Sequence, residues 1–157
     1  MPVVYLVIPC YNEEKVLPET VRRLSEKLGA MREAGLASEG SRMLFVDDGS
    51  RDRTWELISR YSAEDGRVLG IRLAHNRGHQ NALLAGLMTA RERADCAISL
   101  DADLQDDVEV LGEFVRKFLE GCDVVYGVRK KRATDTLFKR ATAQGFYRLL
   151  SALGADV

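Results

Sequence analysis

Cysteine, proline and tryptophan are scarce in this chain, which has three, three and one of them among its 157 residues. No two cysteines form a Cys-x-x-Cys pair, so the sequence indicates neither a zinc knuckle nor a disulfide framework. We expect Cys10 and Cys96, which adjoin apolar runs, to be buried, reduced thiols. No stretch approaches the ~20 apolar residues of a membrane-spanning helix, and no signal-like segment opens the sequence, so we expect this chain to be soluble.

An excess of one charge is also missing, since 23 Lys and Arg residues stand against 24 Asp and Glu residues. Nothing in this balance indicates nucleic acid as a partner. The exception is residues 129–140, where six bases stand against Asp135 alone, a local excess of five positive charges (six minus one). Such a run is most often a solvated surface.

Several common motifs are absent. No Gly-x-Gly-x-x-Gly follows the first apolar run, and no Gly-x-Ser-x-Gly occurs. The segment from Gly35 to Gly40 has the glycine spacing of a phosphate-binding loop, but Ser41 stands where that loop requires lysine.

What is present is an alternation of short, β-branched apolar runs with segments of helical period. The runs predict strands at residues 3–8, 43–46, 68–73, 96–100 and 123–128. Apolar residues at three- and four-residue spacing predict helices at about 13–30, 54–61, 82–90, 108–118 and 137–153. Because proline cannot donate to a sheet ladder, we expect the first strand to end at Pro9.

This alternation predicts an α/β fold with a mostly parallel open sheet and helices on both faces. Ligands of such sheets bind beyond the carboxyl ends of the strands. Four polar clusters fall at predicted strand ends, so we expect them to converge on one edge: residues 9–13, 47–50, 76–79 and 101–105.

The sequence Asp101-Ala102-Asp103-Leu104-Gln105 follows a fully apolar predicted strand. Two carboxylates two residues apart can share a hard cation such as Mg²⁺ or Mn²⁺, and Gln105 adds a neutral oxygen. The plainer interpretation makes one aspartate a helix cap and the other a solvated side chain. The position at a strand end favours the metal site.

Two further strand ends carry candidate ligand-binding residues. The Asp47 carboxylate can accept hydrogen bonds from a base or a ribose, while Ser50 or Asp52 caps the following helix. Tyr11 can lie against a base, although Asn12 as a helix cap explains the same segment. Metal binding by His75 and His79 is improbable, because their segment holds no third ligand.

Five blocks of sequence, in this order and spacing, closely resemble family-2 glycosyltransferases of the GT-A fold. The blocks are VIPCYNEE, FVDDGSRDRTWE, NRGHQNALLAG, SLDADLQD and VVYGVRKKR, and together they cover nearly the whole chain. They look most like the polyprenyl-phosphate branch, which includes dolichol-phosphate mannosyltransferase and bactoprenol glucosyltransferase. The resemblance implies one nucleotide-sugar-binding domain over residues 1–157.

The resemblance also implies roles for individual residues. Asp101, Asp103 and Gln105 match the metal ligands, with Mg²⁺ or Mn²⁺ as the cofactor. Arg129 matches an arginine of the branch, although Val128 replaces the usual serine before it. The positions that match donor-binding residues are Pro9, Tyr11, Glu13, Asp47, Asp48, Asp101, Ala102, Asp103 and Arg129.

The implied reaction is inverting transfer of a hexose, with UDP-glucose as the expected donor, to a polyprenyl phosphate. Asp103 and Arg129 would carry the catalysis, and Arg132 and Arg140 would bind the acceptor or donor phosphates. A phosphate monoester is already ionised near neutral pH and needs no strong general base. A sugar hydroxyl of a polysaccharide or glycolipid is the alternative acceptor, and it would need such a base.

The resemblance implies that the full-length protein continues beyond Val157, with membrane helices that hold it on the cytoplasmic side of the cell membrane. We therefore expect this chain to bind the donor with weak or absent turnover. The apolar side chains of Leu149, Leu150 and Leu153 make a homodimer possible.

Two interpretations from other classes start from the same motif. A phosphohydrolase of the haloacid dehalogenase type also has Asp-x-Asp after an apolar strand, but its acidic pair follows the motif, whereas Asp47 and Asp48 precede it. A non-catalytic receiver-like module would carry its acidic pair on the first strand, which here ends in Pro-Cys-Tyr-Asn-Glu.

Overall fold

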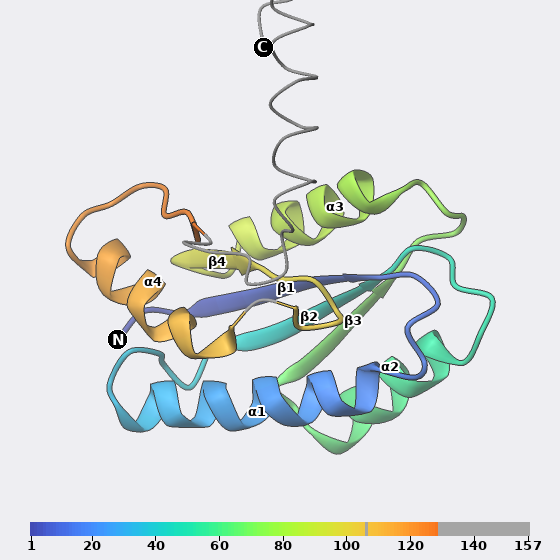
Figure 1. Cartoon of the computed structure of the whole chain (residues 1–157), viewed down its shortest axis with the longest axis horizontal. Helices are drawn as coiled ribbons and strands as arrows, with labels where there is room; N and C mark the ends of the chain where they lie inside the picture. Colours follow the sequence, from blue (N-terminus) through green and yellow to red (C-terminus); the bar gives the residue numbers. More distant parts are fainter. Residues whose placement is uncertain (106, 129–157) are drawn as a thin grey trace, which may run out of the picture. The chain divides into compact units, whose positions relative to one another are not determined.

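The computed structural model describes residues 1–105 and 107–128, and the fold lies within residues 1–125, the first of two compact units. Its centre is a four-stranded parallel sheet in the order β3-β2-β1-β4 (Figure 1). The strands are β1 (Val4–Cys10), β2 (Arg42–Asp47), β3 (Val68–Arg72) and β4 (Cys96–Ser99). The predicted parallel α/β sheet is therefore confirmed.

Helices cover both faces of this sheet (Figure 1). The described helices are α1 (Leu17–Glu33), α2 (Thr54–Glu64), α3 (His79–Arg91), the short 3-10 turn η1 (Val108–Val110) and α4 (Leu111–Leu119). Alternate residues of β1 separate two apolar cores: Leu6 and Ile8 pack with α1, α2 and α4, whereas Tyr5 and Val7 pack with α3. None of these helices is long and apolar enough to cross a membrane.

The prediction that the first strand ends at Pro9 is wrong, because β1 continues through Pro9 to Cys10. Alternate residues of β1 bond to opposite neighbours, and the Val7 carbonyl accepts the Leu100 N–H on the β4 side. Pro9 has the same orientation as Val7, and β4 has already ended there at Ser99. The missing N–H of Pro9 therefore costs no ladder bond with β2.

The predicted strand at residues 123–128 is wrong, because these residues form no strand. An alternating apolar run becomes a strand only where a neighbouring strand takes its hydrogen bonds. Val124 is instead 66% exposed. The predicted helix at residues 137–153 lies outside the described part of the chain.

Helix α3 lies unusually close to the sheet because its buried stripe consists of Ala82, Gly86 and Ala90. A Cβ atom on Gly86 would stand 2.4 Å from Val7 Cγ1 and 2.9 Å from Val46 Cγ2. Only a residue without a side chain fits this contact, which sets how closely α3 packs on the sheet.

We predict that Gly86→Ala lowers the free energy of unfolding by about 1–2 kcal/mol, measured by urea denaturation. Overpacking costs about 1–3 kcal/mol, and the better helix propensity of alanine offsets about 1 kcal/mol of that. Gly29→Ala is the matched control, because a Cβ on Gly29 in α1 would meet no atom within 4 Å. It should raise stability, and equal effects of the two substitutions would contradict the close approach of α3.

Candidate functional site

The loops after β1 and β2 are tied together by reciprocal hydrogen bonds. The Asn12 N–H donates to Ser50 Oγ at 2.9 Å, and the Arg51 N–H donates to Asn12 Oδ1 at 2.9 Å. The Glu13 N–H donates to Thr54 Oγ1 at 2.8 Å. Asn12 adopts a left-handed conformation with φ of 58°, which asparagine tolerates better than most residues. These bonds hold the first two polar clusters side by side.

This arrangement corrects two of the expected helix caps. Asn12 does not cap α1, because the N-cap position is Val16 and no side chain bonds to it. Ser50 does not cap α2 either, since its hydroxyl accepts the Asn12 N–H. Asp52 lies just before the N-cap position, Arg53, and its Oδ1 accepts the N–H of Thr54, the first residue of α2, at 3.0 Å.

The third cluster, residues 76–79, is held in place by Asp48. This side chain is 2% exposed, and its two oxygens accept the N–H groups of Arg77 (2.7 Å) and Gly78 (2.8 Å). Gly49, with φ of 68°, lets the backbone of this loop approach, since a Cβ there would stand 2.8 Å from Asn76 N. Both oxygens of Asp48 are thus occupied in holding the loop before α3.

Asp47 is fully buried, and only one of its oxygens has a hydrogen bond within the described residues. Oδ1 accepts the Ser50 N–H at 3.1 Å, whereas Oδ2 has no hydrogen-bond partner there. The nearest cation is Arg72, whose Nε lies 3.3 Å from Oδ2 and whose guanidinium lies over the Trp55 ring. A buried carboxylate oxygen with a free acceptor position is suited to receive an N–H or O–H donor from a ligand.

Sequence reasoning missed Arg72, although a usable signal exists. It is the last residue of β3, and in the parallel register it stands beside Asp47 at the end of β2. A basic residue at the end of the strand next to an acidic strand end predicts such a pair.

The fourth cluster is a tight turn in which the Leu104 N–H bonds to the Asp101 carbonyl at 3.2 Å. Asp101 and Asp103 are exposed, whereas Ala102 between them is 4% exposed. The Gln105 side chain reaches back, and its Nε2 donates to Asp103 Oδ2 at 2.7 Å. The three predicted metal ligands therefore lie in one turn, with both carboxylates facing solvent.

Glu13 is a third acidic residue, close enough to Asp101 and Asp103 for their charges to affect it. Burial, followed by the charges of Asp103, Asp52 and Asp101, raises the pKa of Glu13 above its ordinary value. Carboxylates at this spacing repel one another, and a divalent cation removes that repulsion. The donor set of carboxylate and amide oxygens therefore fits Mg²⁺ or Mn²⁺. Among the described residues, no group of three His, Cys, Asp or Glu side chains could hold a metal ion by itself.

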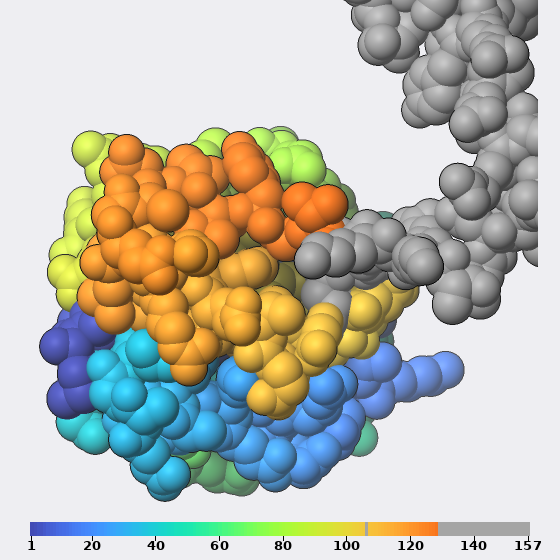
Figure 2. Space-filling view, turned by 60° about the vertical axis from the view of Figure 1, so that its left-hand side comes forward, coloured from blue at the N-terminus to red at the C-terminus, as the bar shows by residue number. Residues whose placement is uncertain are grey.

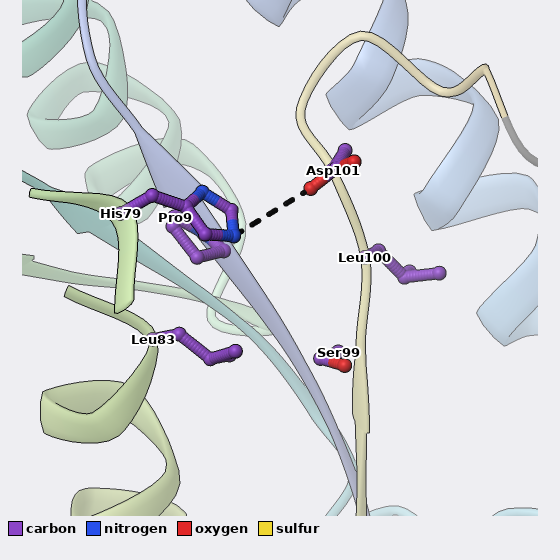
Figure 3. A pocket seen from close by; sticks show the side chains of 6 residues that line it. All are labelled: Pro9, His79, Leu83, Ser99, Leu100 and Asp101. Carbon is purple, nitrogen blue, oxygen red and sulfur yellow. Dashed lines mark ion pairs between the residues drawn. The ribbon is translucent and has the colours of Figure 1, made fainter. Parts of the chain in front are cut away.

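A pocket of about 180 Å³ opens between the start of α3 and the end of β4. Figure 3 shows His79 facing Asp101 across it, with Nε2 3.9 Å from Oδ1. The residues that line the pocket are Pro9, His79, Leu83, Ser99, Leu100 and Asp101. The predicted convergence on one sheet edge is thus confirmed for all four clusters.

The structure describes only some of the remaining predicted site residues. Tyr11 follows β1 and is 40% exposed, so its ring is accessible to a ligand. Arg129, Arg132 and Arg140 lie outside the described residues.

The parallel α/β sheet, with acidic loops at its carboxyl edge, has the GT-A fold of the solved glycosyltransferase structures that this chain resembles. Residues 5–154 match the profile of Glycosyl transferase family 2, and the chain belongs to this family. It is 56% identical over 98% of its length to the uncharacterised glycosyltransferase YkoT of Bacillus subtilis. It is also 37% identical over 92% of its length to the prophage bactoprenol glucosyl transferase homolog of Escherichia coli.

A third relative is the undecaprenyl-phosphate 4-deoxy-4-formamido-L-arabinose transferase of Pseudomonas paraeruginosa, 41% identical over 87% of this chain. The chain spans only 45%, 44% and 38% of these three relatives. Among solved structures, a Pyrobaculum calidifontis mannosyltransferase in complex with GDP-Man and Mn²⁺ shares the fold, with a TM-score of 0.57 and 22% identity over 73% of this chain and 32% of that one. Family membership favours the transferase interpretation over the phosphohydrolase and receiver-like alternatives.

We predict that Glu13→Gln raises the melting temperature of the metal-free protein by about 1–2 °C at pH 7.5, the range of a surface substitution. Because the pKa of Glu13 is raised in the folded protein, its proton stabilises the fold at low pH and that contribution is lost as the pH rises. The difference between the two proteins should therefore vanish near pH 4. Thermal melts across this range test it, and a lower melting temperature for the variant at pH 7.5 would contradict the repulsion.

We predict that Asp48→Asn lowers the free energy of unfolding by about 1–3 kcal/mol, because the new amide N–H₂ faces a backbone N–H that then has no acceptor. Hydrogen exchange at Arg77 and Gly78 should accelerate. Asn76→Ala is the comparison, since exposed Asn76 also bonds the Gly78 N–H, at 3.1 Å. A loss for Asn76→Ala as large as that for Asp48→Asn would show that Asp48 is not the anchor.

Proposed function

We propose that the protein transfers a hexosyl group from a nucleoside diphosphate sugar to a polyprenyl phosphate with inversion, using a divalent cation at Asp101 and Asp103. The observation that carries this proposal is the gathering of Asp47, Glu13, Asp101 and Asp103 on one sheet edge. Such a concentration of acids beside a pocket is suited to a cationic cofactor and to the N–H and O–H groups of a nucleoside.

The two ends of this edge suit different parts of the donor. At the β2 end, Asp47 Oδ2 would accept a base imide N–H or a ribose hydroxyl, with Arg72 beside it. At the β4 end, Asp101, Asp103 and Gln105 would hold Mg²⁺ or Mn²⁺. When bound, the cation stabilises the negative charge that develops on the leaving diphosphate. Asp103 thereby acts at the reacting group, and Arg129 is the residue we propose to assist it.

The acceptor is inferred from two relatives. One is named a bactoprenol glucosyl transferase homolog and the other an undecaprenyl-phosphate transferase of an arabinose derivative. Both names point to a polyprenyl acceptor but to different sugars, so the acceptor class is the better supported part of our proposal. UDP-glucose is the donor we propose. Arg132 and Arg140 are the residues proposed for the acceptor or donor phosphates, and the membrane is the proposed site of action of the intact protein.

A phosphate acceptor also agrees with the chemistry of the site. Its oxygen is already largely ionised near neutral pH, so direct attack on the anomeric carbon opposite the leaving diphosphate needs no strong general base. Attack from that side inverts the anomeric centre. A hydroxyl acceptor would require a base placed beside it.

The test is calorimetric titration of this chain with UDP-glucose and GDP-mannose, with and without Mn²⁺. We predict tighter binding of UDP-glucose and a metal-dependent part that Asp103→Ala weakens at least about tenfold, since even indirect partners of a metal cost 10–100-fold. Asp123→Ala is the control, because Asp123 is likewise an exposed aspartate. Unchanged metal dependence in Asp103→Ala would overturn the metal site, and preference for GDP-mannose would overturn the donor.

A further inference from the structure

The turn that carries Asp101 and Asp103 is fastened to helix α1 by a single buried side chain. Thr20 is 1% exposed, and its hydroxyl lies 2.5 Å from the carbonyl oxygen of Ala102, 82 residues further along the chain. Figure 2 shows the gold segment after β4 lying directly against the blue surface of α1. Thr20 therefore joins two distant parts of the sequence at the centre of the proposed metal site.

Thr20 is distinguished by two acceptors near its hydroxyl, the carbonyls of Val16 and Ala102. A threonine inside a helix commonly bonds the carbonyl four residues before it, and Thr20 has that option with Val16 at 3.0 Å. A hydroxyl has one proton, and the shorter contact is the one to Ala102. Thr89 in α3 has only the first kind of contact, to Ala85 at 2.9 Å.

The rest of the turn directs the two carboxylates outward. Ala102 is buried in the core, and Leu104 packs against the same core with φ of 48°, a conformation that leucine rarely adopts. The turn is thus held by its second and fourth residues, while its first and third, Asp101 and Asp103, face solvent. A turn in an unfavourable conformation persists only where its surroundings hold it there.

We propose that Thr20 is a positioning residue for the metal site: its hydroxyl fixes the Ala102 carbonyl and thereby the mutual orientation of Asp101 and Asp103. This inference rests on the proposed metal-dependent function. Thr20 touches neither cation nor substrate in this scheme and acts through the backbone between the two ligands. Without its hydroxyl, the turn relaxes and the two carboxylates no longer share one ion in the same geometry.

The experiment measures the dissociation constant of Mn²⁺ by electron paramagnetic resonance, with UDP present. Thr20→Val removes the hydroxyl and keeps the shape, whereas Thr20→Ser keeps the hydroxyl and removes the methyl group. Thr89→Val is the matched control. We expect about 10–100-fold weaker Mn²⁺ binding for Thr20→Val, a change within about twofold for Thr20→Ser, and none for Thr89→Val.

The pair of Thr20 variants separates positioning from simple packing, because urea denaturation should show a loss of stability in both. If Thr20→Val does not fold, Thr20→Ala takes its place against Thr20→Ser. Normal Mn²⁺ binding without the hydroxyl, or equal losses in the hydroxyl and methyl variants, would overturn the role of Thr20 and leave the metal site standing. Failure of the unaltered chain to bind Mn²⁺ would instead overturn the proposed function itself.

Discussion

The central position of β1 is the constraint on which the functional edge depends. It pairs with β2 on one side and with β4 on the other, so the loop that follows it has the loops of both neighbours beside it. Asn12 forms a hydrogen bond with Ser50 in the loop after β2, whereas the charge of Glu13 interacts with those of Asp101 and Asp103 after β4. A parallel arrangement with β1 at the edge would separate the loop after β2, which we propose binds the base, from the loop after β4, which we propose binds the metal.

The same edge concentrates charge that the fold alone does not neutralise. The acidic residues at this edge fall into two groups. Asp48 is buried and fully hydrogen-bonded by backbone N–H groups, so its charge serves the architecture. Asp103 is exposed and accepts its two hydrogen bonds from Gln105 alone, and burial together with the charges of Asp103, Asp52 and Asp101 raises the pKa of Glu13. Within residues 1–105 and 107–128, no lysine or arginine forms an ion pair with Glu13, Asp101 or Asp103, which leaves these three acids available to a cation that a ligand brings.

The sequence predicted most of the sheet, because hydrophobic period and strand-end position are local properties. Asp47, Asp101 and Asp103 could be nominated for the same reason. The errors concern partners, which are not local. Whether Pro9 ends a strand depends on which neighbour its N–H would face, and Asn12 and Ser50 bond across to each other rather than to their own helices. Thr20 has the spacing of any core-facing helix residue, so nothing in the sequence singles it out.

Pro9 also affects the pairing of β1 with its other neighbour, β4. The pairing of Val7 with β4 continues to Leu100, whose N–H bonds the Val7 carbonyl. The next donor toward β4 would be the N–H of residue 9, and proline has none. Proline therefore removes one donor of the β1–β4 ladder at the point where the pairing ends, one residue before Asp101. Pro9 in β1 thus lies where the chain after β4 leaves the sheet and begins the turn that carries Asp101 and Asp103.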